Sequence, residues 1–233
     1  MTSERDGYYR HLRSFFDDIA RTKGGYYDTR PGSKRPGHTP WQQLNRGHIK
    51  RVLSSLARTR TLQSFLDVGC GMGDFAHELT ERFDFQRGQG IDLSSGAIDI
   101  AQEQYGSGET TRLSFSVEDV ASGLSFSNRE FDIVCCLNAF HHILPADQKA
   151  VIGHLCRVAN QAVVIEIKRY HVLHRLLNGY KAMGVLDYYP VRISEVLPWS
   201  ADHGFRPFVI HPIFYARVLS PIAILTLVRT EET

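Results

Sequence analysis

A glycine-rich turn is the feature of this sequence with the clearest chemical meaning. The apolar run 65–68 contains Asp67 and leads into glycines at positions 69, 71 and 73, which makes a D-x-G-x-G-x-G pattern. Glycine lets a backbone turn sharply and lets a ligand approach the main chain closely. A helix that starts after such a turn presents free N–H groups to a negative ligand group. The segment therefore predicts a small-ligand site at the end of a strand.

The same turn fits a second pattern. Gly71-x-Gly73-x-x-Ala76 matches the relaxed dinucleotide fingerprint G-x-G-x-x-A. Asp67 argues against a nicotinamide or flavin ligand, because a carboxylate repels a pyrophosphate, whereas it suits a ligand with an ammonium group.

Polar residues also follow the next three expected strands. Asp92 ends the second, and a carboxylate there can accept both hydroxyls of a ribose. Glu118 and Asp119 end the third and could reach a purine amino group, and Asn138 ends the fourth. Open α/β sheets bind ligands outside the carboxyl ends of their strands, so these residues predict one crevice.

The elements that must position these residues alternate along the chain. We expect strands over 64–68, 89–93, 113–117, 131–137 and 162–168, with helices over 75–83, 96–105 and 145–158. This βαβ alternation predicts a mainly parallel sheet with helices on both faces. After a helix over 193–203, strands over 206–211 and 221–229 are separated by only nine residues. That is too few for a crossover, so these two should pair antiparallel.

Several of these runs resemble one family. The run 66–73 resembles motif I of the class I S-adenosylmethionine-dependent methyltransferases, and 90–94 resembles their second motif. Phe131-Asp132-Ile133-Val134 followed by His141-His142-Ile143 resembles the fourth. The resemblance covers roughly 41–229 and implies a Rossmann-like α/β fold, whose seven-stranded, mainly parallel sheet has an antiparallel last strand. The chain departs from the family at 159–162, where Ala-Asn-Gln-Ala replaces the usual Lys-Pro-Gly-Gly turn.

The resemblance also implies S-adenosylmethionine as cofactor and S-adenosylhomocysteine as product. Asp67 and the glycines would hold the methionine part, Asp92 the ribose, and Asp119 with Val120 the adenine. The expected cofactor-binding residues are Asp67, Gly69, Cys70, Gly71, Gly73, Asp92, Leu93, Glu118, Asp119, Val120 and Asn138.

The two histidines after Asn138 are the candidate catalytic residues. Methyl transfer from a sulfonium needs alignment above all, and a base only when the acceptor is a phenol, alcohol or carbon acid. His141 or His142 could take that proton, or both could simply pack and cap a helix. We expect no metal site, because two adjacent histidines cannot easily face one ion.

The N-terminal segment is predicted to cap the site. Helices over 7–22 and 41–58, joined by a Pro/Gly loop over 30–40, would form a lid over 1–60, on a core of 61–233 with a cap insert at about 169–192. Residues 16–20 and 27–28 resemble the entrance of ubiquinone/menaquinone C-methyltransferases. Within the insert, 171–180 predicts a basic amphipathic helix, either a cap or a contact with a membrane surface.

Composition and charge favour a small acceptor. The 233 residues are 42% hydrophobic, and the four cysteines lack C-x-x-C spacing, so neither a disulfide scaffold nor a zinc ribbon is expected. Tyrosines in 8–27 and 170–189 favour an apolar or aromatic acceptor.

The first sixty residues hold thirteen Lys and Arg against five Asp and Glu. Such an excess either is simply solvated or attracts an anionic substrate, a membrane surface or nucleic acid.

We therefore expect a cytoplasmic enzyme that methylates a small, aromatic or lipophilic molecule, with no nucleic-acid partner and no membrane insertion. The longest apolar stretch, 218–228, is too short to span a bilayer. A nucleic-acid methyltransferase is the alternative, although Ala139-Phe140-His141 stands where base-amino methylases carry an Asn-Pro-Pro-Tyr type tetrad. A non-catalytic module that keeps the cofactor fold is the second alternative.

Overall fold

The computed structural model describes residues 2–23, 40–106, 112–168, 181–182, 186–187, 189–212 and 222–230. Its strands are β1 (Ser64–Val68), β2 (Arg87–Asp92), β3 (Leu113–Val117), β4 (Phe131–Cys136), β5 (Ala159–Lys168), β6 (Lys181–Ala182), β7 (Leu186–Asp187), β8 (Phe205–Pro212) and β9 (Ile222–Arg229). Its helices are α1 (Thr2–Lys23), α2 (Pro40–Leu56), α3 (Asp74–Arg82), α4 (Ser95–Tyr105), the 3-10 turn η1 (Phe140–His142), α5 (Pro145–Val158) and α7 (Ile193–Ala201). The pattern confirms the predicted alternation of strands and helices.

The main sheet has seven strands in the order β3-β2-β1-β4-β5-β9-β8. Strands β1 to β5 pair parallel with their neighbours, whereas β9 runs antiparallel to both β5 and β8. The predicted mainly parallel sheet with an antiparallel last strand is therefore confirmed. The chain order reverses between β1 and β4, and such a switch point opens a crevice at the carboxyl ends of the strands.

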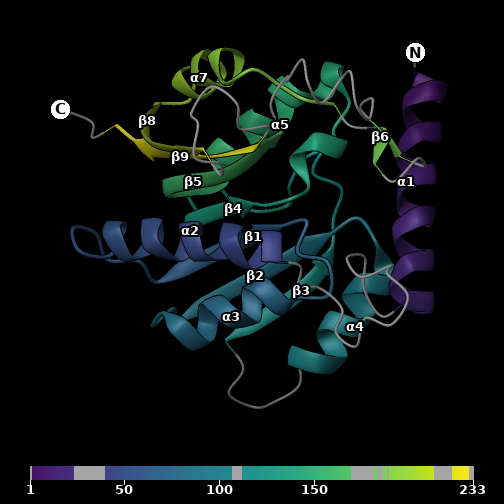
Figure 1. Cartoon of the computed structure of the whole chain (residues 1–233), viewed down its shortest axis with the longest axis horizontal. Coiled ribbons are helices and arrows are strands. Elements are labelled where there is room, and N and C mark those ends of the chain that lie inside the picture. The colour runs from purple at the N-terminus through teal and green to yellow at the C-terminus, as the bar shows by residue number, and fades with distance from the viewer. Residues whose placement is uncertain are drawn as a thin grey trace.

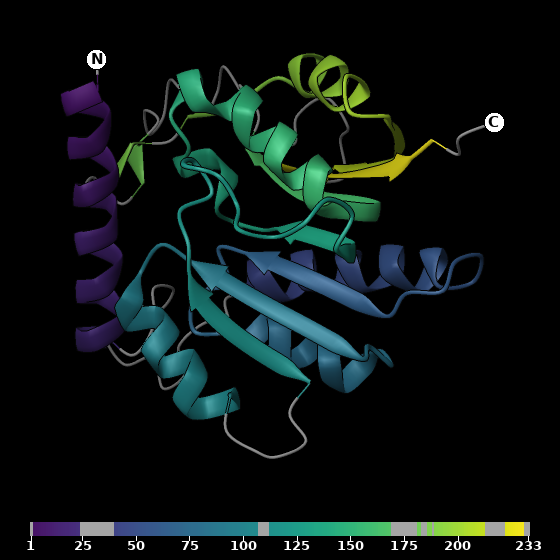
Figure 2. The same cartoon turned by 180° about the vertical axis from the view of Figure 1, so that it is seen from behind.

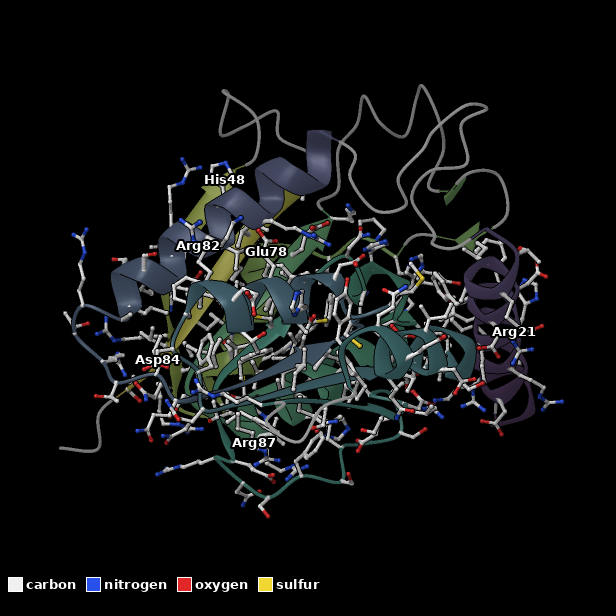
Figure 3. The ribbon with its side chains drawn as sticks, turned by 90° about the horizontal axis from the view of Figure 1, so that it is seen from below. Arg21, His48, Glu78, Arg82, Asp84 and Arg87 are labelled. Carbon is white, nitrogen blue, oxygen red and sulfur yellow. The ribbon has the colours of Figure 1, made fainter. Side chains whose placement is uncertain are left out.

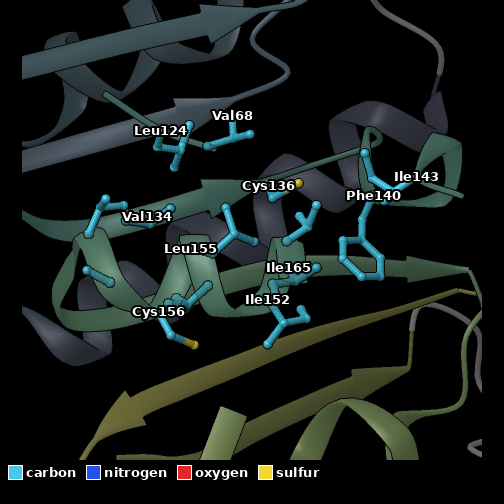
Figure 4. Close-up of a cluster of buried hydrophobic side chains, with 14 of the residues drawn as sticks. Val68, Leu124, Val134, Cys136, Phe140, Ile143, Ile152, Leu155, Cys156 and Ile165 are labelled. Atoms are coloured by element: carbon cyan, nitrogen blue, oxygen red, sulfur yellow. The ribbon is translucent and has the colours of Figure 1, made fainter. Parts of the chain in front are cut away.

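Helices cover both faces of this sheet (Figure 1). Apolar side chains of α2, α3 and α4 form one buried cluster with β1, β3 and β4. Helices α5 and α7 build the other cluster, part of which Figure 4 shows: Ile152 and Leu155 of α5 lie against Val134 and Ile165 of the sheet. Polar residues are scarce in both clusters, so apolar burial holds the three layers together.

Helix α1 lies apart from these layers, across the end of the sheet toward which β1 and β2 point (Figure 2). Its buried side chains recur at helical spacing, with Tyr9, Leu12, Ile19 and Ala20 each 4–6% exposed. Helix α2 is placed differently, because Ile49 and its neighbours pack on a sheet face. The division into a cap over 1–60 and a core over 61–233 stays a prediction. Of the two described N-terminal helices, α1 lies over the strand ends and α2 packs on a sheet face.

Other expectations fall on parts of the chain that are not described. These are the loop 30–40, the helix 171–180 and most of the insert 169–192, of which 181–182 and 186–187 pair as a two-stranded antiparallel sheet. Within the described ranges, no helix is long and apolar enough to cross a membrane. The same residues contain no group of three His, Cys, Asp or Glu side chains arranged to hold a metal ion.

The turn between α5 and β5 lacks the glycines that the family usually has at this place, and an arginine binds its carbonyl groups instead. Helix α5 ends at Val158, and β5 begins at Ala159, three residues earlier than predicted. The guanidinium of Arg229 donates to the carbonyl oxygens of Cys156, Ala159 and Asn160 at 2.5–3.0 Å, and it stacks over Phe205. The Arg229 guanidinium thus donates hydrogen bonds to carbonyl groups at the end of the helix. In a glycine turn, backbone N–H groups would donate these hydrogen bonds.

Replacing Arg229 with lysine should therefore lower the free energy of unfolding by about 2–3 kcal/mol, because one ammonium cannot serve all these buried acceptors. Urea denaturation of the two proteins measures the difference. Arg112→Lys is the matched control, since that side chain is 52% exposed and pairs with the 88%-exposed Asp84, so it should cost less than about 0.5 kcal/mol. An equal loss of unfolding free energy in the two variants would contradict the role of Arg229 at the end of α5.

Candidate functional site

A cavity of about 280 Å³ opens at the carboxyl ends of the parallel strands, under α1. The predicted residues that line it are Asp67, Gly69, Cys70, Gly71, Asp92, Leu93, Glu118, Asp119, Val120, Asn138 and His142. Gly73 and His141 are not among its lining residues. The structure therefore brings most of the predicted residues to one place, from four neighbouring strands; their roles remain predictions.

The glycine turn forms the floor of this cavity. Gly69 and Gly71 adopt left-handed backbone angles, with φ of 75° and 56°. A Cβ at Gly69 would lie 2.4 Å from the Cβ of Ala139, so glycine is required there by packing. A Cβ at Gly71 would meet no atom within 4 Å, so the backbone at this position borders open space. The turn thus exposes its main chain to whatever fills the cavity.

Asp67 is a buried acid at the end of β1, with 2% of its surface exposed. Burial raises its pKa to about 7, the nearby Arg46 opposes that rise, and Asp92 adds to it. A carboxyl group that is partly protonated near neutral pH lacks sufficient positive charge beside it. A ligand ammonium would supply that charge.

Asp92 is held by main-chain donors. Its carboxylate accepts hydrogen bonds from the N–H groups of Gly71 and Ser94, both at 2.9 Å. Burial nevertheless raises its pKa, and the backbone donors only reduce that rise. The glycine turn of β1 and the end of β2 are therefore tied together through this one side chain.

The next acids end β3. Asp119 accepts hydrogen bonds from the N–H of Ala121 and the hydroxyl of Ser122, both at 2.9 Å. The Glu118 carboxylate accepts from Ser125. Both acids line the cavity next to Val120 and Leu93, so an apolar slot with carboxylates at its rim lies at this end.

The histidines lie at the opposite end, in the turn η1 after β4. Both are buried, with ring centroids 4.2 Å apart. His142 faces the cavity, and its ring contacts Phe16 of α1 edge-on at 5.4 Å. Burial, with a smaller effect from Lys168, lowers the pKa of His142 to about 3. Its imidazole is therefore neutral at physiological pH.

Helix α1 forms the outer wall, docked at both ends. Asp17 accepts hydrogen bonds from the Ser94 hydroxyl at 2.6 Å and from the Gly96 N–H at 2.9 Å, at the start of α4. Toward the other end, Arg5 and Tyr9 donate to Asp147 of α5 at 3.0 and 2.8 Å. A carboxylate at a helix N-terminus is favoured by the helix dipole, so Asp17 fixes α1 next to the residues around Asp92.

Sequence reasoning missed three parts of the wall. The α1 residues Tyr9, Leu12, Phe16, Ile19 and Ala20 line the cavity, and their i, i+3, i+4 spacing was visible, but not the surface they would face. Arg46 of α2 carried no signal beyond its charge. Glu166 of β5 did carry one, because it interrupts the apolar run 162–167 with an acid.

Comparisons with known proteins agree with this geometry. Residues 65–162 match the family model described as a methyltransferase domain. Ajmaline N-methyltransferase of Rauvolfia serpentina is 30% identical over 111 residues, which span 47% of this chain and 37% of that protein. Residues 65–162 are thus similar to a methyltransferase domain, which agrees with the resemblance to the class I S-adenosylmethionine-dependent family seen in the sequence.

Solved structures show the same fold. Magnesium protoporphyrin IX methyltransferase from Synechocystis PCC 6803, with bound S-adenosylhomocysteine, superposes with a TM-score of 0.69 at 18% identity, covering 95% of this chain and 99% of that one. The [4+2]-cyclase SpnF superposes with a TM-score of 0.65 at 17% identity, covering 95% and 96%. Because a protein described as a cyclase shares the fold, the fold alone does not specify the reaction.

The electrostatics of Asp67 can be measured directly. A carbon-13 NMR titration of the aspartate carboxyl groups should show one that titrates near pH 7, about three units above an ordinary aspartate. This signal should disappear in Asp67→Asn and persist in the exposed-site control Asp84→Asn. An Asp67 that titrates near pH 4 would show that the carboxylate is already well solvated or paired.

Proposed function

We propose that this protein transfers a methyl group from S-adenosylmethionine to a small aromatic or lipophilic acceptor. The main support for this proposal is the order of the acids along the sheet, from Asp119 after β3 through Asp92 on β2 to Asp67 on β1. These positions suit an adenine, a ribose and an amino-acid ammonium in sequence. The match to a methyltransferase domain over 65–162 supports this proposal.

The residues around the glycine turn fit the amino-acid end of such a cofactor. Asp67 would bind its ammonium, and the open space beside Gly71 leaves room for the chain. Arg46 is the only lysine or arginine among the described lining residues, and it lies close enough to Asp67 to oppose the rise in its pKa. Its guanidinium would therefore bind the carboxylate of the same amino acid.

The chemistry asks little more of the chain. S-adenosylmethionine, when bound, supplies a methyl group already activated by a positive sulfur. Helix α1 and the strand ends would exclude water and align the acceptor. His142, neutral and facing the cavity, would accept a proton when the acceptor must lose one. His141 does not line the cavity, so we assign the base to His142 alone.

The acceptor is best sought among small molecules. Two of the similar proteins are an ajmaline N-methyltransferase and a magnesium protoporphyrin IX methyltransferase, both named for small-molecule acceptors. The wall from α1 is apolar and aromatic, which suits a lipophilic acceptor. Figure 3 shows that the basic side chains Arg21 of α1 and Arg82 of α3 lie on opposite sides of the molecule.

Two substitutions test the cofactor assignment by calorimetry. Arg46→Met should weaken the binding of S-adenosylhomocysteine by about 1–3 kcal/mol but leave the binding of 5′-methylthioadenosine unchanged, because the latter lacks the amino-acid carboxylate. Asp92→Asn should weaken the binding of both ligands, since both carry the ribose. Lys50→Met is the control: Lys50 also pairs with Glu78, as Arg46 does at 3.6 Å, but does not line the cavity.

A wild-type protein that binds neither ligand would refute the proposed function. Equal loss of both ligands in Arg46→Met would instead remove only the role assigned to Arg46.

His142→Gln tests the base. Transfer of labelled methyl groups to a panel of phenols and aromatic amines should fall about 10²-fold or more, because a positioned base contributes at least that much. Affinity for S-adenosylhomocysteine should not change. The rate should show no step from this residue between about pH 5 and pH 9, since its pKa is lowered to about 3. His141→Gln should lower thermal stability more than the rate, and the reverse ranking would contradict the assignment.

A further inference from the structure

Two acids in the cavity wall, Asp74 and Glu166, have no part in the proposed cofactor site. The described lining residues include six carboxylates, Asp67, Asp74, Asp92, Glu118, Asp119 and Glu166, against the single cation Arg46. Four of the six belong to the proposed cofactor site, and Asp74 accepts a hydrogen bond from Tyr105 at 2.8 Å. Glu166 is left over, although its side chain is only 3% exposed.

The strand order places Glu166 away from the cofactor acids. Adenine, ribose and amino-acid positions follow β3, β2 and β1, and β4 and β5 come next in the sheet. Cys136 pairs in register with Ile165, so the next residues along, Leu137 and Glu166, lie at the same level. Leu137, Glu166 and His142 all line the cavity. Glu166 therefore lies on the side where the acceptor must meet the donor.

The immediate surroundings of Glu166 already accommodate a cation. Lys168 donates to Glu166 Oε1 at 2.7 Å, and its side chain is 18% exposed. A buried ion pair rarely stabilises a fold more than apolar side chains of similar volume would. Burial raises the pKa of the Cys136 thiol, and the charges of Asp67 and Glu166 add to that rise, so both acids lie near this thiol.

Apart from Arg46, the described basic residues of the N-terminal segment do not line this wall. Arg10, Arg13 and Arg21 of α1 are exposed to solvent. Acids outnumber the single cation Arg46 among the described lining residues, so this wall carries the opposite sign. A negative, poorly hydrated wall favours a cationic ligand over an anionic one.

We propose that Glu166 binds a protonated amino group of the acceptor, so that the acceptor is a lipophilic organic amine. The inference rests on the proposed function and adds the substrate class. It concerns the group that Glu166 recognises and leaves open which atom of the acceptor is methylated.

The test compares three probes that share an indole ring: tryptamine, tryptophol and indole-3-propanoic acid. At pH 7 they are cationic, neutral and anionic. Calorimetry is carried out on protein saturated with S-adenosylhomocysteine. Tryptamine should bind about tenfold or more tightly than the other two, and Glu166→Gln should abolish this preference while leaving the affinity for S-adenosylhomocysteine unchanged.

Lys168→Met provides the second variant. Removing the resident cation should strengthen tryptamine binding, because the acceptor no longer competes with the lysine for Glu166. Its thermal melting temperature is measured alongside, so that loss of folding is recognised.

Several outcomes would overturn the inference: a preference for the acid or the alcohol, no binding of any probe, or a tryptamine preference that survives Glu166→Gln. A fall in S-adenosylhomocysteine affinity in Glu166→Gln would also overturn it, by assigning Glu166 to the cofactor. Wild-type protein that does not bind S-adenosylhomocysteine would refute the proposed function itself, which separates the two failures.

Discussion

Two carboxylates, Asp67 and Asp92, are held close together and out of water at the ends of neighbouring parallel strands. In register, Asp67 lies opposite Gly90, two residues before Asp92. Burial raises the pKa of each acid, and the charge of Asp92 raises the pKa of Asp67 further. Backbone N–H groups and one arginine offset only part of this cost, so the unliganded site is electrostatically incomplete. The layers on either face provide the apolar packing that holds such a site in place.

The outer wall depends on the same region. Asp17 attaches α1 to Ser94 and Gly96, shortly after Asp92, so the helix that lines the outer side of the cavity is anchored next to this acid. Its other anchor, Asp147, belongs to α5 on the opposite face of the sheet. Helix α1 therefore joins the two helical layers across the strand ends, and any movement of it must break hydrogen bonds to both.

Charge divides the cavity into two parts that the fold alone does not distinguish. The acids after β1, β2 and β3 suit the proposed cofactor, whereas Glu166 on β5 lies on the side proposed for the acceptor. A protein described as a [4+2]-cyclase shares the fold, so the fold alone does not specify the reaction. In this chain the side chains on the β4 and β5 side include His142 and Glu166.

The sequence by itself predicted the sheet and the acids that line the cavity, because both depend on local patterns. Strand and helix alternate with clear turn signals, and a parallel sheet necessarily gathers Asp67, Asp92 and Asp119 at one edge. Only the tertiary structure decided that His142 and not His141 faces the cavity, since adjacent residues in a 3-10 turn point in different directions. It also decided that α1 docks through Asp17, that Arg229 replaces a glycine turn, and that Glu166 enters the wall. The contacts of Asp17 with Ser94 and of Arg229 with Ala159 join residues 77 and 70 positions apart, and Glu166 is placed by the pairing of β5 with β4, so no local spacing encodes them.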